Sequence, residues 1–308
     1  MPEEPASITT TSPPPPPVPI PPDNFIDLVK VIDHPGDDLF PEVSPDGTKI
    51  AYAARKIDNL DVFYFYPGAP RVNPIQVTRH IADDAHPSWL GNEALFFDSS
   101  RLDTLSIWRV QITGQRGTNQ ITVRDYNDFD PAVSPDGRKV VFCSIRQKKA
   151  LDYRPKVEDE PPTLWVSNID GSNITQIGAG YNPKWSPDGR RIIFYAPSAT
   201  NFDIWIMNSD GTDLTQIVAD KSDDIDPAFS PDMKAIVFAS NRPGAVGTAI
   251  PKNFDIWAMS LVGEGLTQLT FSPGDDTGPV WSITGEIFFQ SNRDGGWDIW
   301  KGRPVIEW

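Results

Sequence analysis

The chain has few residues that could cross-link it, carry it through a membrane or hold nucleic acid. Its 308 residues include one cysteine, Cys143, which excludes an internal disulfide and a thiolate metal cluster. No apolar run approaches the roughly 18 residues that span a bilayer, so we expect no transmembrane segment. Lys and Arg number 27 against 42 Asp and Glu, and the net charge of −15 argues against nucleic acid as a partner. Cys143 lies in the apolar stretch KVVFCS, where we expect a small buried residue rather than a catalytic thiol.

The first 24 residues differ in composition from the rest. They are nearly all Pro, Ser, Thr and Glu and contain no Phe, Tyr or Trp before Phe25, which predicts an extended polyproline spacer. We therefore expect residues 1–24 to be a disordered tether and residues 25–308 to be the folded domain. Such an arm would remain after loss of an export signal or a lipidated cysteine, which favours an extracytoplasmic location, periplasmic or lipid-anchored at the cell envelope. A plain disordered tail or an SH3-type ligand is the alternative.

A turn with the sequence SPDG occurs at residues 44–47, 134–137 and 186–189, and its surroundings also recur. The segments LFPEVSPDGTKIAYAA, FDPAVSPDGRKVVFCS, YNPKWSPDGRRIIFYA and IDPAFSPDMKAIVFAS are clear copies of one unit, and two others are degenerate. The steps between copies are 44 to 52 residues. The proline that all six copies share falls at Pro41, Pro87, Pro131, Pro183, Pro227 and Pro279.

Each unit contains three or four apolar or aromatic stretches bounded by Gly, Pro, Asn and Asp, which predicts short strands. Six units of four strands are typical of a β-propeller, because sheets packed radially cover one another's faces. We predict an all-β, six-bladed propeller in which Phe25–Asp33 supplies the missing strand of the last unit. Pro followed by Asp-Gly suits a tight hairpin turn, so we interpret the SPDG serines as structural and name no catalytic residue.

The SPDG turns and the stretches FDIWIMNSDGTDLTQI at 202–217 and FDIWAMS at 254–260 resemble the WD40-like PD-repeat propellers typified by the carboxy-terminal domain of the periplasmic protein TolB. The resemblance covers residues 25–308 and implies the fold. The resemblance says little about activity, because related propellers serve as binding modules, as gates on peptidases and as lyases. TolB also has an amino-terminal α/β domain where this chain has the Pro-rich arm, so the resemblance does not extend to a Tol–Pal role.

One face of the expected propeller varies between units. The 52-residue steps come from long loops at 145–162 and 241–253, and loops that lengthen on one face commonly carry recognition. Acidic pairs in the linkers precede the shared proline on the same face. The residues predicted for a ligand-binding face are Asp38, Asp84, Asp128, Asp224 and Asp276 with Arg101, Arg146, Arg242 and Arg293. Repeated structural Asp–Arg pairing, which would also include Arg55, is the alternative interpretation.

The same linkers suggest a cation site. Carboxylates that converge on a channel mouth suit a divalent cation such as Ca²⁺. The candidate metal ligands are Asp37, Asp83, His34 and His86, since each histidine stands near an acidic pair. No other cofactor is indicated.

Two functions fit these observations. The first is a non-enzymatic binding or scaffold module, monomeric, which engages a protein, peptide or cation at the acidic face. It is favoured because no nucleophile–base motif or phosphate loop is found. The second is a metal-dependent polysaccharide lyase or hydrolase at the channel mouth, in which Arg101 would hold a substrate carboxylate.

Overall fold

The computed structural model describes residues 21–306 except 33, 57, 70–71, 103, 115–116, 123–125, 147–159 and 245–252. The arm before residue 21 and most of the two long loops lie outside the described residues, so our expectations for them stay predictions. The described residues form strands and no helix, and no membrane-crossing helix is therefore found among them. The prediction of an all-β chain is confirmed.

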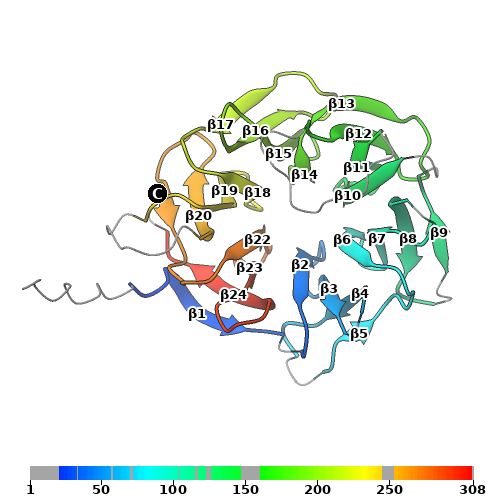
Figure 1. Cartoon of the computed structure of the whole chain (residues 1–308), viewed down its shortest axis with the longest axis horizontal. Helices are drawn as coiled ribbons and strands as arrows, with labels where there is room; N and C mark the ends of the chain where they lie inside the picture. Colours follow the sequence, from blue (N-terminus) through cyan, green and yellow to red (C-terminus); the bar gives the residue numbers. More distant parts are fainter. Residues whose placement is uncertain are drawn as a thin grey trace, which may run out of the picture.

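Six antiparallel four-stranded sheets are arranged in a ring around one axis, as Figure 1 shows, which confirms the six-bladed propeller. Blades 1 to 3 are β2 (Asp38–Val43), β3 (Ile50–Arg55), β4 (Leu60–Phe65), β5 (Ile75–Gln76); β6 (Asp84–Leu90), β7 (Ala94–Ser99), β8 (Ser106–Gln111), β9 (Thr118–Gln120); and β10 (Asn127–Val133), β11 (Lys139–Ile145), β12 (Thr163–Asn168), β13 (Thr175–Ala179). Blades 4 to 6 are β14 (Tyr181–Trp185), β15 (Arg191–Pro197), β16 (Phe202–Asn208), β17 (Thr215–Val218); β18 (Asp224–Phe229), β19 (Ala235–Ser240), β20 (Asp255–Ser260), β21 (Thr267–Gln268); and β22 (Asp276–Trp281), β23 (Ile287–Ser291), β24 (Asp298–Pro304), β1 (Phe25–Lys30).

The ring is closed by the amino-terminal strand. Strand β1 pairs antiparallel with β24, from Phe25 opposite Pro304 to Lys30 opposite Trp300, as the sequence predicted. The two residues before β1 are bound as well. Asp23 makes an ion pair with Arg293 at 2.7 Å, and the Asn24 side chain donates to the Gln268 carbonyl at 2.7 Å. Asp23 and Asn24, which we expected at the end of the tether, therefore join blade 6 to blade 5.

The SPDG segments are tight turns between the first and second strands of a blade. In the first copy the Ser44 hydroxyl donates to the Asp46 carboxylate at 2.7 Å and accepts the Lys49 N–H at 2.9 Å. Gly47 takes a φ of 70°, which glycine adopts without strain. Ser134 and Ser186 make the same bonds in their own turns. Each of these serines is held by its turn, in agreement with the structural interpretation.

The hydrophobic core lies mainly between neighbouring blades. Tyr52 and Phe63 of blade 1 pack in one cluster with Val280 and Phe288 of blade 6. Burying side chains of this size contributes about 1.5 to 3 kcal/mol each, so the interfaces between blades supply most of the stability. A rigid frame of this kind can hold polar side chains in fixed positions around the channel.

Candidate functional site

The first member of the pair joins one blade to the next in every linker pair except that of Asp37, which faces Arg55. In four linkers its side-chain oxygen accepts the backbone N–H at the start of the third strand of the preceding blade. These bonds are Asp83 to Leu60 at 2.7 Å, Asn127 to Leu105 at 3.1 Å, Asp223 to Phe202 at 3.2 Å and Asp275 to Phe254 at 3.0 Å. A carboxylate that satisfies a buried donor in this way has a structural task.

In blades 2, 3, 5 and 6 the second member of the pair is buried beside an arginine of its own blade, whereas in blade 1 the buried Asp38 faces His34 at 3.7 Å. Asp84, Asp224 and Asp276 are fully buried, and their carboxylates lie 2.6 to 2.8 Å from the guanidinium groups of the facing arginines. The pairs are Asp84–Arg101, Asp224–Arg242 and Asp276–Arg293, and in blade 3 the charge of Arg146 acts on the nearly buried Asp128. Burial raises the pKa of both Asp224 and Asp276 to about 6, against the lowering effect of the arginines. Of the residues that we predicted as a ligand-binding face, the geometry favours structural pairing for all but Asp38.

The paired arginines also lie over the tryptophan of the third strand. Their guanidinium carbons stand 4.1 to 5.2 Å from the ring centroids, in the pairs Arg101–Trp108, Arg146–Trp165, Arg242–Trp257 and Arg293–Trp300. In blade 1 the position over the aromatic ring is taken by Lys56, 4.5 Å from the centroid of Phe63. Arg55, which we placed in the same register, instead faces Asp37 at 3.7 Å.

The four predicted metal ligands lie in different local settings. His34 faces Asp38 at 3.7 Å, Asp37 faces Arg55, and Asp83 accepts the Leu60 N–H. In the described part of the chain, the group of three or more His, Cys or acidic side chains close enough for a metal contains His86, Asp98 and Asp130. Of the four candidates it includes only His86. Asp37, Asp83 and His34 have no place in it.

The residue before each shared proline forms a second ring, which the sequence analysis missed. Each innermost strand has a β-bulge at this point, and its residue takes a positive φ between 44° and 60°. A bulge re-aims a side chain, and all six residues line the channel cavity. They are Phe40, His86, Asp130, Asn182, Asp226 and Gly278. The sequence did contain a sign of this ring, since the residue before the constant proline differs in chemistry from one copy of the repeat to the next.

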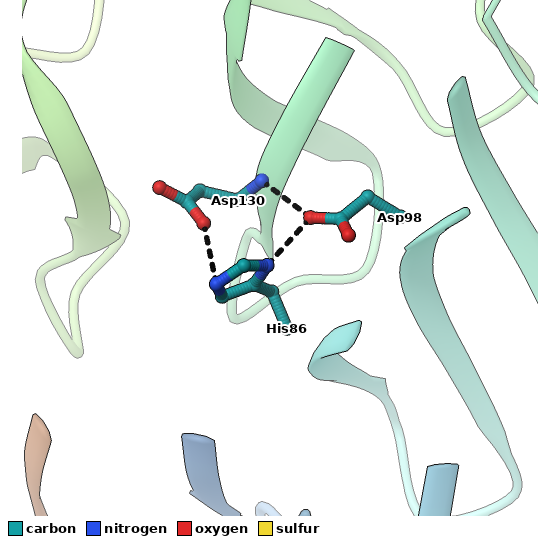
Figure 2. A group of neighbouring side chains, drawn as sticks. All are labelled: His86, Asp98 and Asp130. Carbon is teal, nitrogen blue, oxygen red and sulfur yellow. Dashed lines mark hydrogen bonds and ion pairs between the residues drawn. The ribbon is translucent and has the colours of Figure 1, made fainter. Parts of the chain in front are cut away.

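His86 lies between two carboxylates in this ring, as Figure 2 shows. Its Nδ1 is 2.7 Å from Asp98 and its Nε2 is 3.2 Å from Asp130, and the Asp130 N–H donates to the same Asp98 oxygen at 2.9 Å. Burial alone would lower the pKa of His86, but the charges of Asp130 and Asp98 outweigh it and raise the pKa to about 9. At neutral pH His86 is therefore an imidazolium that hydrogen-bonds Asp98 through Nδ1 and makes an ion pair with Asp130 through Nε2. The Phe40 ring packs on it with a centroid separation of 3.9 Å.

An ion pair crosses the channel one level below the ring. Lys184 of β14 meets Glu42 of β2 at 2.9 Å, and these two strands stand on opposite sides of the channel in Figure 1. Both residues follow the shared proline of their blade by one position. The pair joins blades 1 and 4 across the axis, so it narrows the channel and gives the space above it a floor.

The ring and this floor bound a cavity of about 990 Å³. At the mouth its lining includes Arg146, Phe254 and Trp297, and along the inner strands it reaches Glu42 and Lys184. A volume of this size matches the pockets in which proteins hold small molecules or peptide side chains. The opening lies on the linker face that the sequence analysis selected.

The cavity offers charge and hydrogen bonds rather than a nucleophile. Cys143 is fully buried, and burial raises the pKa of its thiol well above the usual value, so thiolate chemistry is disfavoured. Burial also raises the pKa of Asp130 and Asp226. Among the described residues that line the cavity, the polar groups are suited to recognition.

Comparisons with known proteins agree with this geometry. The family model of the TolB β-propeller domain (PD40) matches residues 149–250. An uncharacterized protein of Agrobacterium fabrum is 36% identical over 106 residues, which cover 31% of this chain and 33% of the relative. The match thus spans about a third of that relative's length.

Solved structures are similar over most of the chain. A TolB-like protein from Agrobacterium tumefaciens has a TM-score of 0.62 at 19% identity, with 89% of this chain and 93% of the other covered. An oligogalacturonate lyase in complex with manganese has a TM-score of 0.59 at 11% identity, with 90% and 93% covered. At these identities the likeness shows the fold alone. Together with the repeats, these findings show that the chain is a six-bladed β-propeller, and residues 149–250 are similar to the TolB β-propeller domain.

Proposed function

We propose that the chain is a non-enzymatic binding module that takes a segment of a protein partner into the channel cavity. The observation that carries this proposal is the cavity above the Glu42–Lys184 pair, which has a wall of fixed polar groups and a mouth on one face. Constant residues hold the blades together, and the residues that vary between blades face the cavity. A rigid scaffold with a varied concave surface is suited to recognition.

The partner and the setting follow the TolB resemblance. We place the module outside the cytoplasm at the cell envelope, tethered through its Pro-rich arm, as a monomer that binds a protein or peptide. A lipid anchor upstream would suit such a tether. These points rest on the resemblance and on the composition of the arm, and they belong to the proposal.

The experiment compares peptide affinity between two variants, one with a new side chain inside the channel and one with the same side chain on the outer surface. Gly278 is replaced by His, because His86 already occupies the equivalent bulge of blade 2 with a positive φ. Gly285→His is the matched control, since Gly285 also has a positive φ and a Cβ there meets nothing within 4 Å. Peptides selected from a random library on the wild type are then measured by calorimetry on each variant.

We expect the selected peptides to bind the Gly285→His variant as they bind the wild type and to lose at least about tenfold in affinity on Gly278→His, about 1.4 kcal/mol. Equal affinity for both variants would show that the cavity is not the binding site. Failure to select any peptide would contradict the proposed class of partner.

A metal-dependent lyase remains the second candidate, because the potential ligand atoms of His86, Asp98 and Asp130 lie within 4.8 Å of one another. The set fits a metal poorly. Both ring nitrogens of His86 face carboxylates, and the ring would have to lose a proton that those carboxylates stabilise. We derive no step through a metal.

Thermal melts with EDTA, Mn²⁺ and Ca²⁺ separate the two candidates. The binding module predicts the same melting temperature in each solution. A stabilisation by Mn²⁺ that disappears in His86→Ala, together with cleavage of oligogalacturonate by the metal-loaded wild type, would favour the lyase.

A further inference from the structure

Charges in the channel do not balance. Below the mouth, the acidic side chains at or behind the wall are Glu42, Asp98, Asp130 and Asp226, against the basic His86 and Lys184. The mouth adds Glu160, Asp223 and Asp275 and one more basic side chain, Arg146. Glu42 is paired with Lys184, and His86 is shared by Asp98 and Asp130. Asp226 has no cationic side chain within ion-pair distance among the described residues. Its hydrogen-bond donors among the described residues are the Asn182 side chain at 2.9 Å and the Gly278 N–H at 3.2 Å, while the charges of Lys184 and His86 act on it from beyond ion-pair distance.

A second feature beside Asp226 independently indicates a ligand. Tyr195 lines the cavity and is 93% buried, since its relative exposure is 7%, and its hydroxyl makes no hydrogen bond within the described part of the chain. Because the residue lines the cavity and no side chain of the described part occupies this hydroxyl, it can exchange a hydrogen bond with a polar group that enters the cavity. Burial and the nearby charges of Asp226 and Asp130 raise the pKa of Tyr195 well above its usual value, which keeps the hydroxyl neutral.

The same wall also offers apolar surface. Tyr195 stacks on Tyr181 with ring centroids 5.2 Å apart, and Phe202 meets both rings edge-on. All three rings line the cavity. A methylene chain can lie on such a surface while its charged end reaches a carboxylate, as lysine and arginine stems do elsewhere in proteins.

We propose that the channel contains a subsite for an alkylammonium or alkylguanidinium group, with Asp226 as the counter-charge and the cluster of Tyr181, Tyr195 and Phe202 as the seat of the alkyl stem. The Tyr195 hydroxyl lies within this subsite as a neutral hydrogen-bonding group. The ligand class is that of a lysine or arginine side chain, and the subsite would anchor the partner segment of the proposed function, on which this biological role rests.

A hard divalent cation suits the position less well. Ca²⁺ requires six to eight oxygen ligands, whereas both Asp226 oxygens already accept hydrogen bonds and the neighbouring Asn182 presents its NH₂ group. An organic cation needs a single strong acceptor and an apolar seat, and both are present here.

The test uses small probes, so that it does not depend on a peptide partner. Binding of n-butylammonium, n-butylguanidinium and the neutral n-butanol is measured by ligand-observed NMR on the wild type, Asp226→Asn and Tyr195→Phe. The matched control is Asp213→Asn, which removes the same charge from an exposed turn of the same molecule. Thermal melts establish that each variant is folded.

We expect both cations, and not n-butanol, to bind the wild type and Asp213→Asn. Affinity should fall at least tenfold in Asp226→Asn and severalfold in Tyr195→Phe, and it should weaken as salt is added. Equal binding of the cations by wild type and Asp226→Asn, binding of n-butanol as tight as that of the cations, or no binding of either cation would overturn the subsite.

The outcome also separates this inference from the proposed function. Binding of the small cations without selection of any peptide would leave the subsite in place and contradict the peptide-binding role. Selection of peptides that lack Lys and Arg and enter the channel, with no binding of the small cations, would support the peptide-binding role and contradict the subsite.

Discussion

Two rings of side chains stand two residues apart on the same inner strands, and they behave differently. The outer ring, which includes Asp84 and Asp224, has a buried carboxylate beside an arginine in blades 2, 3, 5 and 6. The inner ring, which includes His86 and Asp226, changes its chemistry at nearly every blade and faces the cavity. Residues that hold the frame are subject to the same physical demand in each blade, whereas residues that meet a ligand are not. The acidic character of this face therefore has two separate origins.

Substitutions that break a buried Asp–Arg pair of the outer ring should destabilise the fold more than substitutions of exposed arginines. Arg101→Met leaves the fully buried Asp84 without its counter-charge and also removes the contact with Trp108. We expect the free energy of unfolding to fall by about 3 to 5 kcal/mol in urea denaturation. Arg190→Met, at an exposed SPDG turn, is the control and should change it by less than about 0.5 kcal/mol. An equal, small effect of both substitutions would show that the buried pairs do not hold the blades.

The pH dependence of the free energy of unfolding provides a second test of the role of the buried carboxylates in the frame. Burial raises the pKa of Asp255 to about 8, with Asp276 and Asp23 adding to the effect, and Arg293 contacts both of these neighbours. The folded protein therefore keeps a proton that the unfolded chain releases near pH 4. The free energy of unfolding should fall as the pH rises from about 4 to about 8.

In Asp255→Asn this decrease should become shallower, because the substituted amide does not titrate. Urea unfolding of wild type and variant at pH 5 and pH 8 checks the expectation. A wild type that gains stability over this interval to the same extent as the variant would exclude Asp255 as the titrating group.

Closure of the ring gives a smaller effect. Asp23→Ala removes one of the two carboxylates that contact Arg293 and the acceptor of the Phe271 N–H. Because Arg293 keeps Asp276, we expect a loss of about 1 to 2 kcal/mol. Asp27→Asn, which removes a charge from an exposed position of β1 and suits the φ of 55° there, serves as the control. If both variants unfold at the same urea concentration, Asp23 does not help to close the ring.

The sequence predicted the frame well because the frame repeats. The shared proline, the SPDG turns and the FDIW strands recur often enough to give the number of blades, and the incomplete last copy gave the closure by β1. The functions of the linker acids were open, since a buried Asp–Arg pair and a ligand-facing carboxylate have the same sequence pattern. Only burial separates them.

The inner ring was missed for a different reason. A bulge before the proline reverses the direction in which Asp130 and Asp226 point, and the alternation of a regular strand gives no sign of it. The link between His86 and Asp98 joins two strands of one blade, and the Glu42–Lys184 pair joins blades 142 residues apart in the chain. Such contacts depend on ring geometry, which no local pattern contains.

The most direct measurement compares Asp84→Asn with Asp226→Asn, the same substitution in the two rings, for both urea unfolding and n-butylammonium binding. The account predicts that Asp84→Asn loses about 3 to 5 kcal/mol of stability and, while folded, still binds the cation, whereas Asp226→Asn stays within about 1 kcal/mol of the wild type and loses binding. If Asp226→Asn proved as unstable as Asp84→Asn, or kept its affinity, the division between a structural and a ligand-facing ring would be wrong.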